Sequence, residues 1–147
     1  EIQSIESTSK PVLRMPVHKS GIKTMETKVL ENETEVQVFT GGDDNAVAMS
    51  VFELANTTII GEVTSSIEKA ASSTVTSCQL FQNKSKLLTT SVDQRVRVWD
   101  ITSDNKLVLR NIKYTTIADT GSCDIIETNE NKHSIVLGGV GLSVWEY

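Results

Sequence analysis

The stretch SVDQRVRVWDI, residues 91 to 101, joins a polar turn to an alternating apolar run that ends in a tryptophan and an acid. Its last four residues have two further copies, VFEL at 51–54 and VWEY at 144–147. The aromatic residues of the three copies are 47 and 46 residues apart (99 minus 52, and 145 minus 99). This period is close to the roughly 40–45 residues of a four-stranded propeller blade, so the sequence predicts a repeated β-architecture.

Short segments with a period of two, separated by Gly, Asn, Asp and Ser, predict an all-β fold. The strands are expected near residues 22–30, 35–41, 46–54 and 57–63, then 75–82, 86–91, 95–101 and 106–112, then 122–127, 134–138 and 142–147. The last unit therefore lacks a fourth strand. Residues 11–17, PVLRMPV, carry two prolines and suit the outer edge strand of a preceding blade.

These strands divide the chain into four parts. We expect an outer strand plus linker over 1–17, a first blade over 18–66, a second over 67–116, and a last blade without its outer strand over 117–147. Propellers close with about four to eight blades, so about three four-stranded blades form an incomplete ring. We expect the C-terminal portion of a larger multi-propeller protein, whose remaining blades, in the same polypeptide, cover the open ends.

The composition of the chain argues against several classes of function and location. The 147 residues carry a formal net charge of -5, which argues against a broad phosphate-binding surface. No apolar run approaches the ~20 residues that cross a bilayer, and no signal segment is visible. Cys78 and Cys123 are expected to remain free and buried, as in a reducing compartment. We therefore expect a cytoplasmic protein without membrane insertion.

The second unit resembles WD-repeat propellers. Ser91, Asp93 and Trp99 match the serine, aspartate and tryptophan of that family's structural hydrogen-bond tetrad, whereas Ala71 stands at the histidine position. In the family the aspartate holds the histidine, the histidine contacts the serine, and the serine accepts the indole N–H.

The other two units match this tetrad in part. The first has His18 and Asp44, with Thr40 as a further candidate, but Phe52 replaces tryptophan and has no N–H to donate. The third has Trp145 but carries Gly138-Gly139 where serine and aspartate are expected. The imperfect copies favour a divergent scaffold over a catalytic core.

Chemical motifs are weak along the chain. His18, His133 and the two cysteines lack the close spacing of a zinc site, and no residue order suggests a catalytic triad. The glycines at 41–42 and 138–141 separate strands, so they predict hairpin turns and not phosphate loops. Arg95 and Arg97 alternate with valines on the side of Trp99, which favours packing or an ion pair over phosphate binding. We therefore expect no enzyme activity, no metal and no cofactor in this chain.

Three stretches together resemble the C-terminal end of the WD-repeat protein six family and its fungal counterparts. They are STVTS at 73–77, SVDQR at 91–95 and LGGVGLSVW at 137–145. The resemblance implies a non-catalytic subunit that binds an FtsJ-like tRNA methyltransferase and supports 2′-O-ribose methylation of wobble nucleotide 34. S-adenosylmethionine and the catalytic residues would then belong to the partner, and tRNA would contact this segment indirectly. The alternative is a generic WD-repeat scaffold in a trafficking or ubiquitin-ligase complex.

Partner contacts are expected on one rim of the propeller, because loops on a rigid scaffold commonly carry binding. The turns at 43–45, 93–94 and 139–141 are expected there, beside the segments at 18–20, 71–73 and 119–121. The candidate contact residues are Asp43, Asn45, Gln94, Arg95, Lys19 and Asp119.

Overall fold

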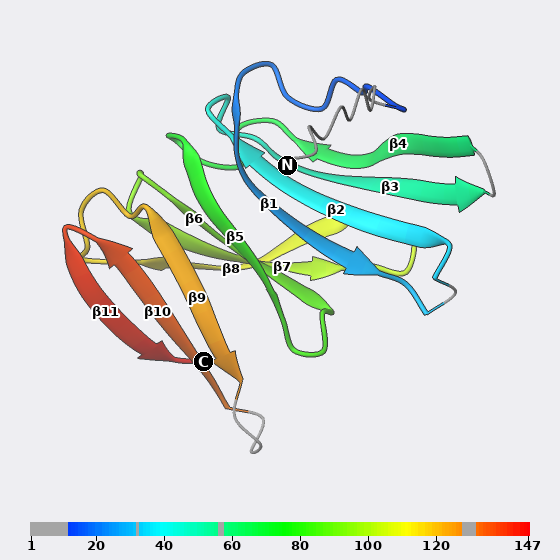
Figure 1. Cartoon of the computed structure of the whole chain (residues 1–147). Coiled ribbons are helices and arrows are strands. Elements are labelled where there is room, and N and C mark those ends of the chain that lie inside the picture. The colour runs from blue at the N-terminus through cyan, green and yellow to red at the C-terminus, as the bar shows by residue number, and fades with distance from the viewer. Residues whose placement is uncertain (1–11, 32, 56–57, 128–131) are drawn as a thin grey trace, which may run out of the picture.

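The computed structural model describes residues 12–31, 33–55, 58–127 and 132–147. Within these ranges the chain forms eleven β-strands in three antiparallel sheets (Figure 1). All eleven predicted strands are present, and the largest difference in their ends is in β4, which continues to Ile67. No helix of the described part of the chain is long and apolar enough to cross a membrane.

Each sheet contains strands that are consecutive in the chain and adjacent in space. Sheet one consists of β1 (Ile22–Val29), β2 (Glu35–Gly42), β3 (Val47–Ala55) and β4 (Thr58–Ile67). Sheet two consists of β5 (Val75–Phe81), β6 (Lys86–Ser91), β7 (Arg95–Ile101) and β8 (Leu107–Tyr114). Sheet three consists of β9 (Ser122–Glu127), β10 (His133–Gly139) and β11 (Gly141–Glu146).

Sheet two lies between the other two sheets. Its first strand, β5, contacts β1 and β2 of sheet one and β9 of sheet three (Figure 1). Phe39 and Met49 of sheet one pack with Leu87 and Trp99 of sheet two in one apolar core. A second core fills the space between sheets two and three, where Leu137 packs among side chains that include Phe81 and Leu88 of sheet two.

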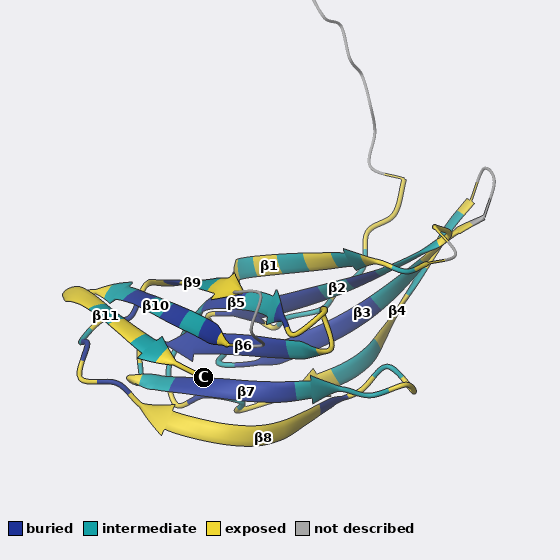
Figure 2. Ribbon diagram, turned by 90° about the horizontal axis from the view of Figure 1, so that it is seen from below, coloured by how far each residue is buried: buried dark blue, intermediate teal, exposed yellow. Residues whose placement is uncertain are grey.

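Burial along the strands reflects this order. In β6, five consecutive residues from Leu87 to Ser91 are buried, because side chains on both faces of sheet two meet a neighbouring sheet. In β10 of sheet three, buried and half-buried positions alternate, as expected for a sheet that is covered on one face. Figure 2 shows the same contrast between the buried strands β6 and β7 and the exposed strands β8 and β11.

The segment before β1 differs from the expected outer strand. Residues 12–17 form no strand, and Pro11 with the residues before it lies outside the described part. Val12 and Leu13 instead line an apolar groove on sheet one together with Phe52. An edge strand needs a neighbouring strand for its hydrogen bonds, so this segment contributes apolar contacts to sheet one and no sheet pairing.

Two leucines of sheet three provide a matched test of this packing. Leu137 is 0% exposed in the core between sheets two and three, whereas Leu142 is 79% exposed. Leu137→Ala should lower the free energy of unfolding by about 2–5 kcal/mol, because it leaves a cavity. Leu142→Ala should change it by about 0.5 kcal/mol or less. Urea denaturation measures both, and equal losses would contradict the described packing.

Candidate functional site

The three sheets share a rim at which the expected turns meet the segments that join the sheets. The Asp43 amide donates to the Gly21 carbonyl at 2.9 Å, and the Val92 amide donates to the Thr74 carbonyl at 3.1 Å. In sheet three the Val140 amide donates to the Ala118 carbonyl at 2.8 Å. The turns and the joining segments predicted to lie on one rim are therefore side by side in each sheet.

In sheet one, His18 links this rim to the core. Its side chain is 1% exposed, and Nδ1 donates to the Asp44 carboxylate at 2.8 Å. Its Nε2 lies 2.9 Å from Thr40 Oγ1 and forms a second side-chain hydrogen bond there. The structure thus brings together the three residues that the resemblance singled out in the first unit.

The carboxylate of Asp44 fixes the turn before β3. Burial alone would raise its pKa, but the hydrogen bonds from His18 and from the backbone amides of Lys19 and Ala46 outweigh this effect and lower the pKa. Asp44 is therefore ionised and held by donors from both sides of the rim. Its role in the structure is to join the entering segment to the β2–β3 turn.

Phe52 does not occupy the position equivalent to Trp99, which corrects the alignment of the aromatic endings. Trp99 is paired with Leu87, two positions beyond the pair Thr89 and Arg97. In sheet one the pair Thr40 and Ala48 is followed two positions later by Ser50, and Phe52 is two residues further along β3. Ser50 thus stands where sheet two has tryptophan, and Phe52 packs near Gly61 on β4.

In sheet two the indole of Trp99 is held by Thr89 and not by Ser91. Trp99 Nε1 donates to Thr89 Oγ1 at 2.9 Å in a buried contact. Ser91 Oγ donates to the Ser73 carbonyl at 3.1 Å and accepts from the Asp93 amide at 3.2 Å. The predicted pairing of Ser91 with the indole is therefore wrong, because Ser91 lies at the end of β6 and closes the turn.

Asp93 has an arginine partner in place of the missing histidine. Arg97 Nη2 donates to Asp93 Oδ2 at 2.6 Å, and Nη1 donates to Oδ1 at 3.2 Å. Both side chains are nearly buried, at 5% and 6% exposure. Burial by itself would raise the pKa of Asp93, but the Arg97 guanidinium and the Ser72 amide lower it. The alternation of the strand predicts Arg97 on the side of Trp99 but does not predict its pair with Asp93.

The equivalent aspartates of the two sheets bind side chains from different elements. Asp44 binds His18 of the segment before β1, whereas Asp93 binds Arg97 of β7. Lys19 and Ser72 donate their backbone amides to Asp44 and Asp93 at 2.7 and 2.9 Å, so Ala71 does lie at the position of His18. In sheet one the strand position equivalent to Arg97 holds a small residue, Ala48, which pairs with Thr40 as Arg97 pairs with Thr89. In sheet two the large and small residues change places: Ala71 lies on the joining segment, and Arg97 lies on the strand.

Sheet three retains the least of this arrangement. Trp145 Nε1 donates to Ser143 Oγ at 2.9 Å within the same strand, and the ring packs against the core between sheets two and three. Leu137, Gly138 and Gly139 provide no side-chain acceptor near the turn. A Cβ on Gly139 would lie 2.5 Å from the Ala118 carbonyl oxygen, so the close approach of the joining segment requires glycine at this position.

The candidate contact residues lie on the rim, and several of them have intramolecular partners. Asp43 accepts from Thr74 Oγ1 at 3.1 Å and pairs with Lys23 at 3.0 Å. Lys19 pairs with Glu68 at 2.6 Å on the surface. The guanidinium of Arg95 lies 5.1 Å from the centre of the Tyr114 ring.

Three further candidates adopt a positive φ. The angles are 65° at Asn45, 61° at Gln94 and 49° at Asp119. This left-handed conformation suits short polar side chains in turns, so it accounts for Asn45 and Asp119 in local terms but not for the longer Gln94. Their role in partner binding stays a prediction.

The remaining reactive side chains are buried or dispersed. Cys78 and Cys123 are free and buried, and burial raises their pKa values to about 12 and about 11. His133 is buried on β10 and makes an edge contact with Phe81. Among the described residues, no three His, Cys, Asp or Glu side chains form a group that could hold a metal ion.

Comparison with known proteins adds no family. The chain matches no protein-family model, and no curated protein matches it. The residues and the geometry described above therefore carry the functional inference.

Removing the arginine that faces Asp93 tests the buried pair. Arg97→Ala should lower the free energy of unfolding by about 3–5 kcal/mol, because it leaves a nearly buried carboxylate without its main partner. Adding Ala71→His to this variant should restore part of the loss, since sheet one holds Asp44 in that way. Lys19→Ala, in an exposed pair, is the control and should cost about 1 kcal/mol or less. Equal losses for Arg97→Ala and Lys19→Ala in urea denaturation would contradict this role of Arg97.

The two thiols should be unreactive in the folded protein. At pH 8 almost none of either thiol is ionised, given pKa values of about 12 and about 11, and burial blocks the reagent. Ellman's reagent should modify both only after unfolding in urea. Thr116→Cys adds an exposed thiol and should react at once, as the positive control. Rapid modification of two thiols in the folded wild type would contradict the described core.

Proposed function

We propose that this chain is part of a WD-repeat β-propeller and acts as a non-catalytic scaffold subunit of an FtsJ-like tRNA methyltransferase. The observation that carries the proposal is the repeated rim, where a turn aspartate, Asp44 or Asp93, binds the segment that enters its sheet. WD repeats, as the resemblance describes them, use an aspartate in this turn to hold a histidine of the entering segment, as Asp44 holds His18 in sheet one. The meander order of the three sheets supports the interpretation of each as a blade.

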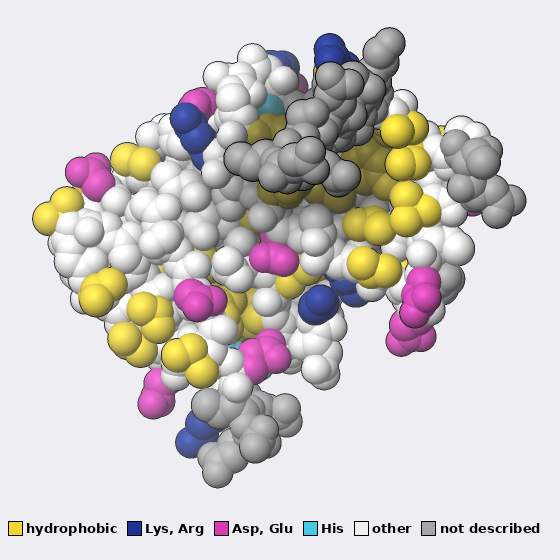
Figure 3. All heavy atoms as spheres, viewed as in Figure 1, with side chains coloured by type: hydrophobic (Ala, Val, Ile, Leu, Met, Phe, Trp, Pro, Cys, Tyr) yellow, Lys and Arg dark blue, Asp and Glu magenta, His cyan; other side chains and the backbone are white. Residues whose placement is uncertain are grey.

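Further blades of the same polypeptide would cover the outward faces of the two outer sheets. Phe52 and Leu54 line an apolar groove of about 460 Å³ on sheet one. On sheet three Ile126, Leu142 and Val144 are exposed, and Figure 3 shows hydrophobic side chains over both ends of the stack. Large exposed apolar patches mark interaction sites in most proteins. Each face would pack against a blade as sheet two packs against its neighbours.

The identity of the partner rests on the resemblance at 73–77, 91–95 and 137–145. In this proposal the rim with Arg95 and Gln94 contacts the methyltransferase in the cytoplasm, and the partner supplies S-adenosylmethionine and every catalytic group. The net charge of -5 favours indirect contact between this segment and tRNA. The chain itself holds a rigid surface and performs no bond chemistry.

Affinity capture of the full-length protein tests the proposal. The tagged protein should recover an FtsJ-like methyltransferase, and cells without it should lose 2′-O-methylation of nucleotide 34, measured by mass spectrometry of tRNA. Arg95→Glu should reduce the recovery by about fivefold or more, because rim contacts of this size are worth about 1 kcal/mol. Lys84→Glu makes the same charge change in the turn between β5 and β6, at the opposite end of sheet two, and should leave recovery unchanged.

Failure of both the recovery and the methylation result would reject the methyltransferase. Recovery of a trafficking or ubiquitin-ligase complex in its place would assign the chain to a different WD-repeat scaffold. Equal effects of Arg95→Glu and Lys84→Glu would place the contact away from the predicted rim.

A further inference from the structure

Arg95, at the rim end of β7, carries a charge that no carboxylate of the described chain neutralises. The other two arginines of sheet two, Arg97 and Arg110, each form an ion pair with an aspartate. Arg95 has no such pair within the described residues, and its Nη1 donates only to the neutral Ser72 hydroxyl at 3.3 Å. A guanidinium is always charged and has five N–H donors, so most of the donors of Arg95 remain unused.

The carboxylate closest to Arg95 in the sequence, Asp93, is already fully occupied. Its Oδ1 accepts the backbone amide of Arg95 at 3.1 Å and Nη1 of Arg97 at 3.2 Å. Its Oδ2 accepts Nη2 of Arg97 at 2.6 Å and the amide of Ser72 at 2.9 Å. Because a carboxylate has about four lone-pair sites, Asp93 has none left for the guanidinium of Arg95.

The ring of Tyr114 orients the Arg95 guanidinium. Tyr114 is the last residue of β8 and lies directly opposite Arg95 in the register of sheet two. The Thr115 amide donates to the Gln94 carbonyl at 2.9 Å and continues this pairing at the rim. The guanidinium carbon lies 5.1 Å from the centre of the ring, which is a cation–π contact. This contact orders the arginine without neutralising its charge, so a ligand loses less entropy in ordering it.

The two Nη atoms form the edge of the Arg95 guanidinium that a ligand can reach. The Nε atom is shielded from solvent, so it takes no part in binding. Nη2 has no acceptor within the described chain and is not among the shielded atoms. Nη1 keeps one N–H group after its bond to Ser72. Tyr114 beside this edge is 73% exposed, and tyrosine and arginine are enriched among the residues that dominate protein interfaces.

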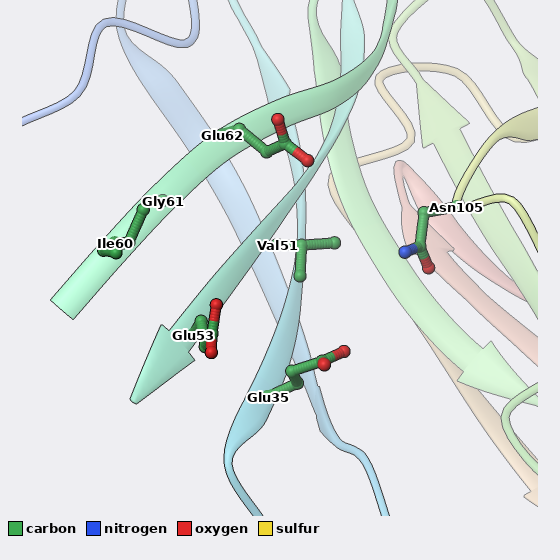
Figure 4. A pocket seen from close by; sticks show the side chains of 7 residues that line it. All are labelled: Glu35, Val51, Glu53, Ile60, Gly61, Glu62 and Asn105. Carbon is green, nitrogen blue, oxygen red and sulfur yellow. The ribbon is translucent and has the colours of Figure 1, made fainter. Parts of the chain in front are cut away.

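The charge around Arg95 favours a single acidic ligand. Lys113 precedes Tyr114, and its Nζ lies 5.5 Å from the centre of the Tyr147 ring, with no ion pair inside the described ranges. A polyanion such as RNA would need more cations than this rim offers, whereas one carboxylate needs one guanidinium. Acids of the chain gather elsewhere: Figure 4 shows Glu35, Glu53 and Glu62 around a pocket toward the end of sheet one opposite the rim.

We propose that Arg95 and Tyr114 form a docking site for an aspartate or glutamate side chain of the methyltransferase. The carboxylate accepts one hydrogen bond from each Nη atom of Arg95, a bidentate pair that a lysine could not form. The exposed ring of Tyr114 packs against the same partner segment and excludes water from the ion pair. This inference rests on the proposed function, which places that partner on the same rim.

A charge swap with the full-length protein tests the ion pair. Each surface aspartate or glutamate of the methyltransferase is changed in turn to arginine, and the variants are captured with tagged Arg95→Glu. One of them should raise the recovery by Arg95→Glu about fivefold or more, because it rebuilds the pair with its charges exchanged. The same variant should lower the recovery by the wild type. Arg95→Gln replaces Arg95→Glu should the latter melt early in circular dichroism.

Two substitutions of Tyr114 test the role of the ring. Tyr114→Ala should lower recovery of the methyltransferase by about fivefold, whereas Tyr114→Phe keeps the aromatic face and should recover it as the wild type does. Val108→Ala shortens another exposed side chain, near the opposite end of β8, and is the matched control that should change nothing.

The outcomes separate this inference from the proposed function. No recovery of the methyltransferase by the wild type would reject the proposed function and the docking site with it. Recovery by the wild type that Arg95→Glu and Tyr114→Ala leave unchanged, or that no charge swap restores, would overturn the docking site alone. Loss of the wild-type recovery after ribonuclease treatment would assign Arg95 to an RNA phosphate and would also overturn it.

Discussion

The structure depends on burial of sheet two on both faces. Leu87 and Trp99 meet sheet one, while Leu88 and Val98 meet sheet three. Because alternate side chains of a strand point to opposite faces, β6 and β7 must be apolar or paired at nearly every position. This requirement explains why Arg97, on a nearly buried strand, must have a carboxylate within reach.

The two outer sheets differ from sheet two in that only one face of each is covered by another sheet of the described chain. Each buries one face against sheet two. The other face carries apolar side chains such as Phe52, which lines the groove on sheet one, or the exposed Val144 on sheet three. A sheet that faced only water on that side would alternate cleanly between apolar and polar residues. With one more sheet at each end, the outer sheets would be buried on both faces, as sheet two is.

The strands could be predicted from the sequence, because a period of two and clear turn residues mark all eleven. The register of the aromatic residues could not be predicted from the sequence. A shift of two positions keeps a side chain on the same face, so Phe52 and Ser50 satisfy the same pattern. For the same reason Ser91 was predicted in a place that Thr89 takes, two residues earlier on β6. The Arg97–Asp93 pair joins a turn to the strand that follows it, four residues further along the chain, and no short motif specifies this contact.

Sheets one and two share one contact at the rim and differ in another. Both sheets keep a turn aspartate that accepts the backbone amide of the joining segment, at Asp44 and Asp93. The second partner of the carboxylate is an imidazole in one sheet and a guanidinium in the other. A nearly buried carboxylate needs donors, but donors of several shapes can supply them. The backbone contact therefore fixes the rim geometry, and the side-chain partner can change as long as the neighbouring residue changes in size.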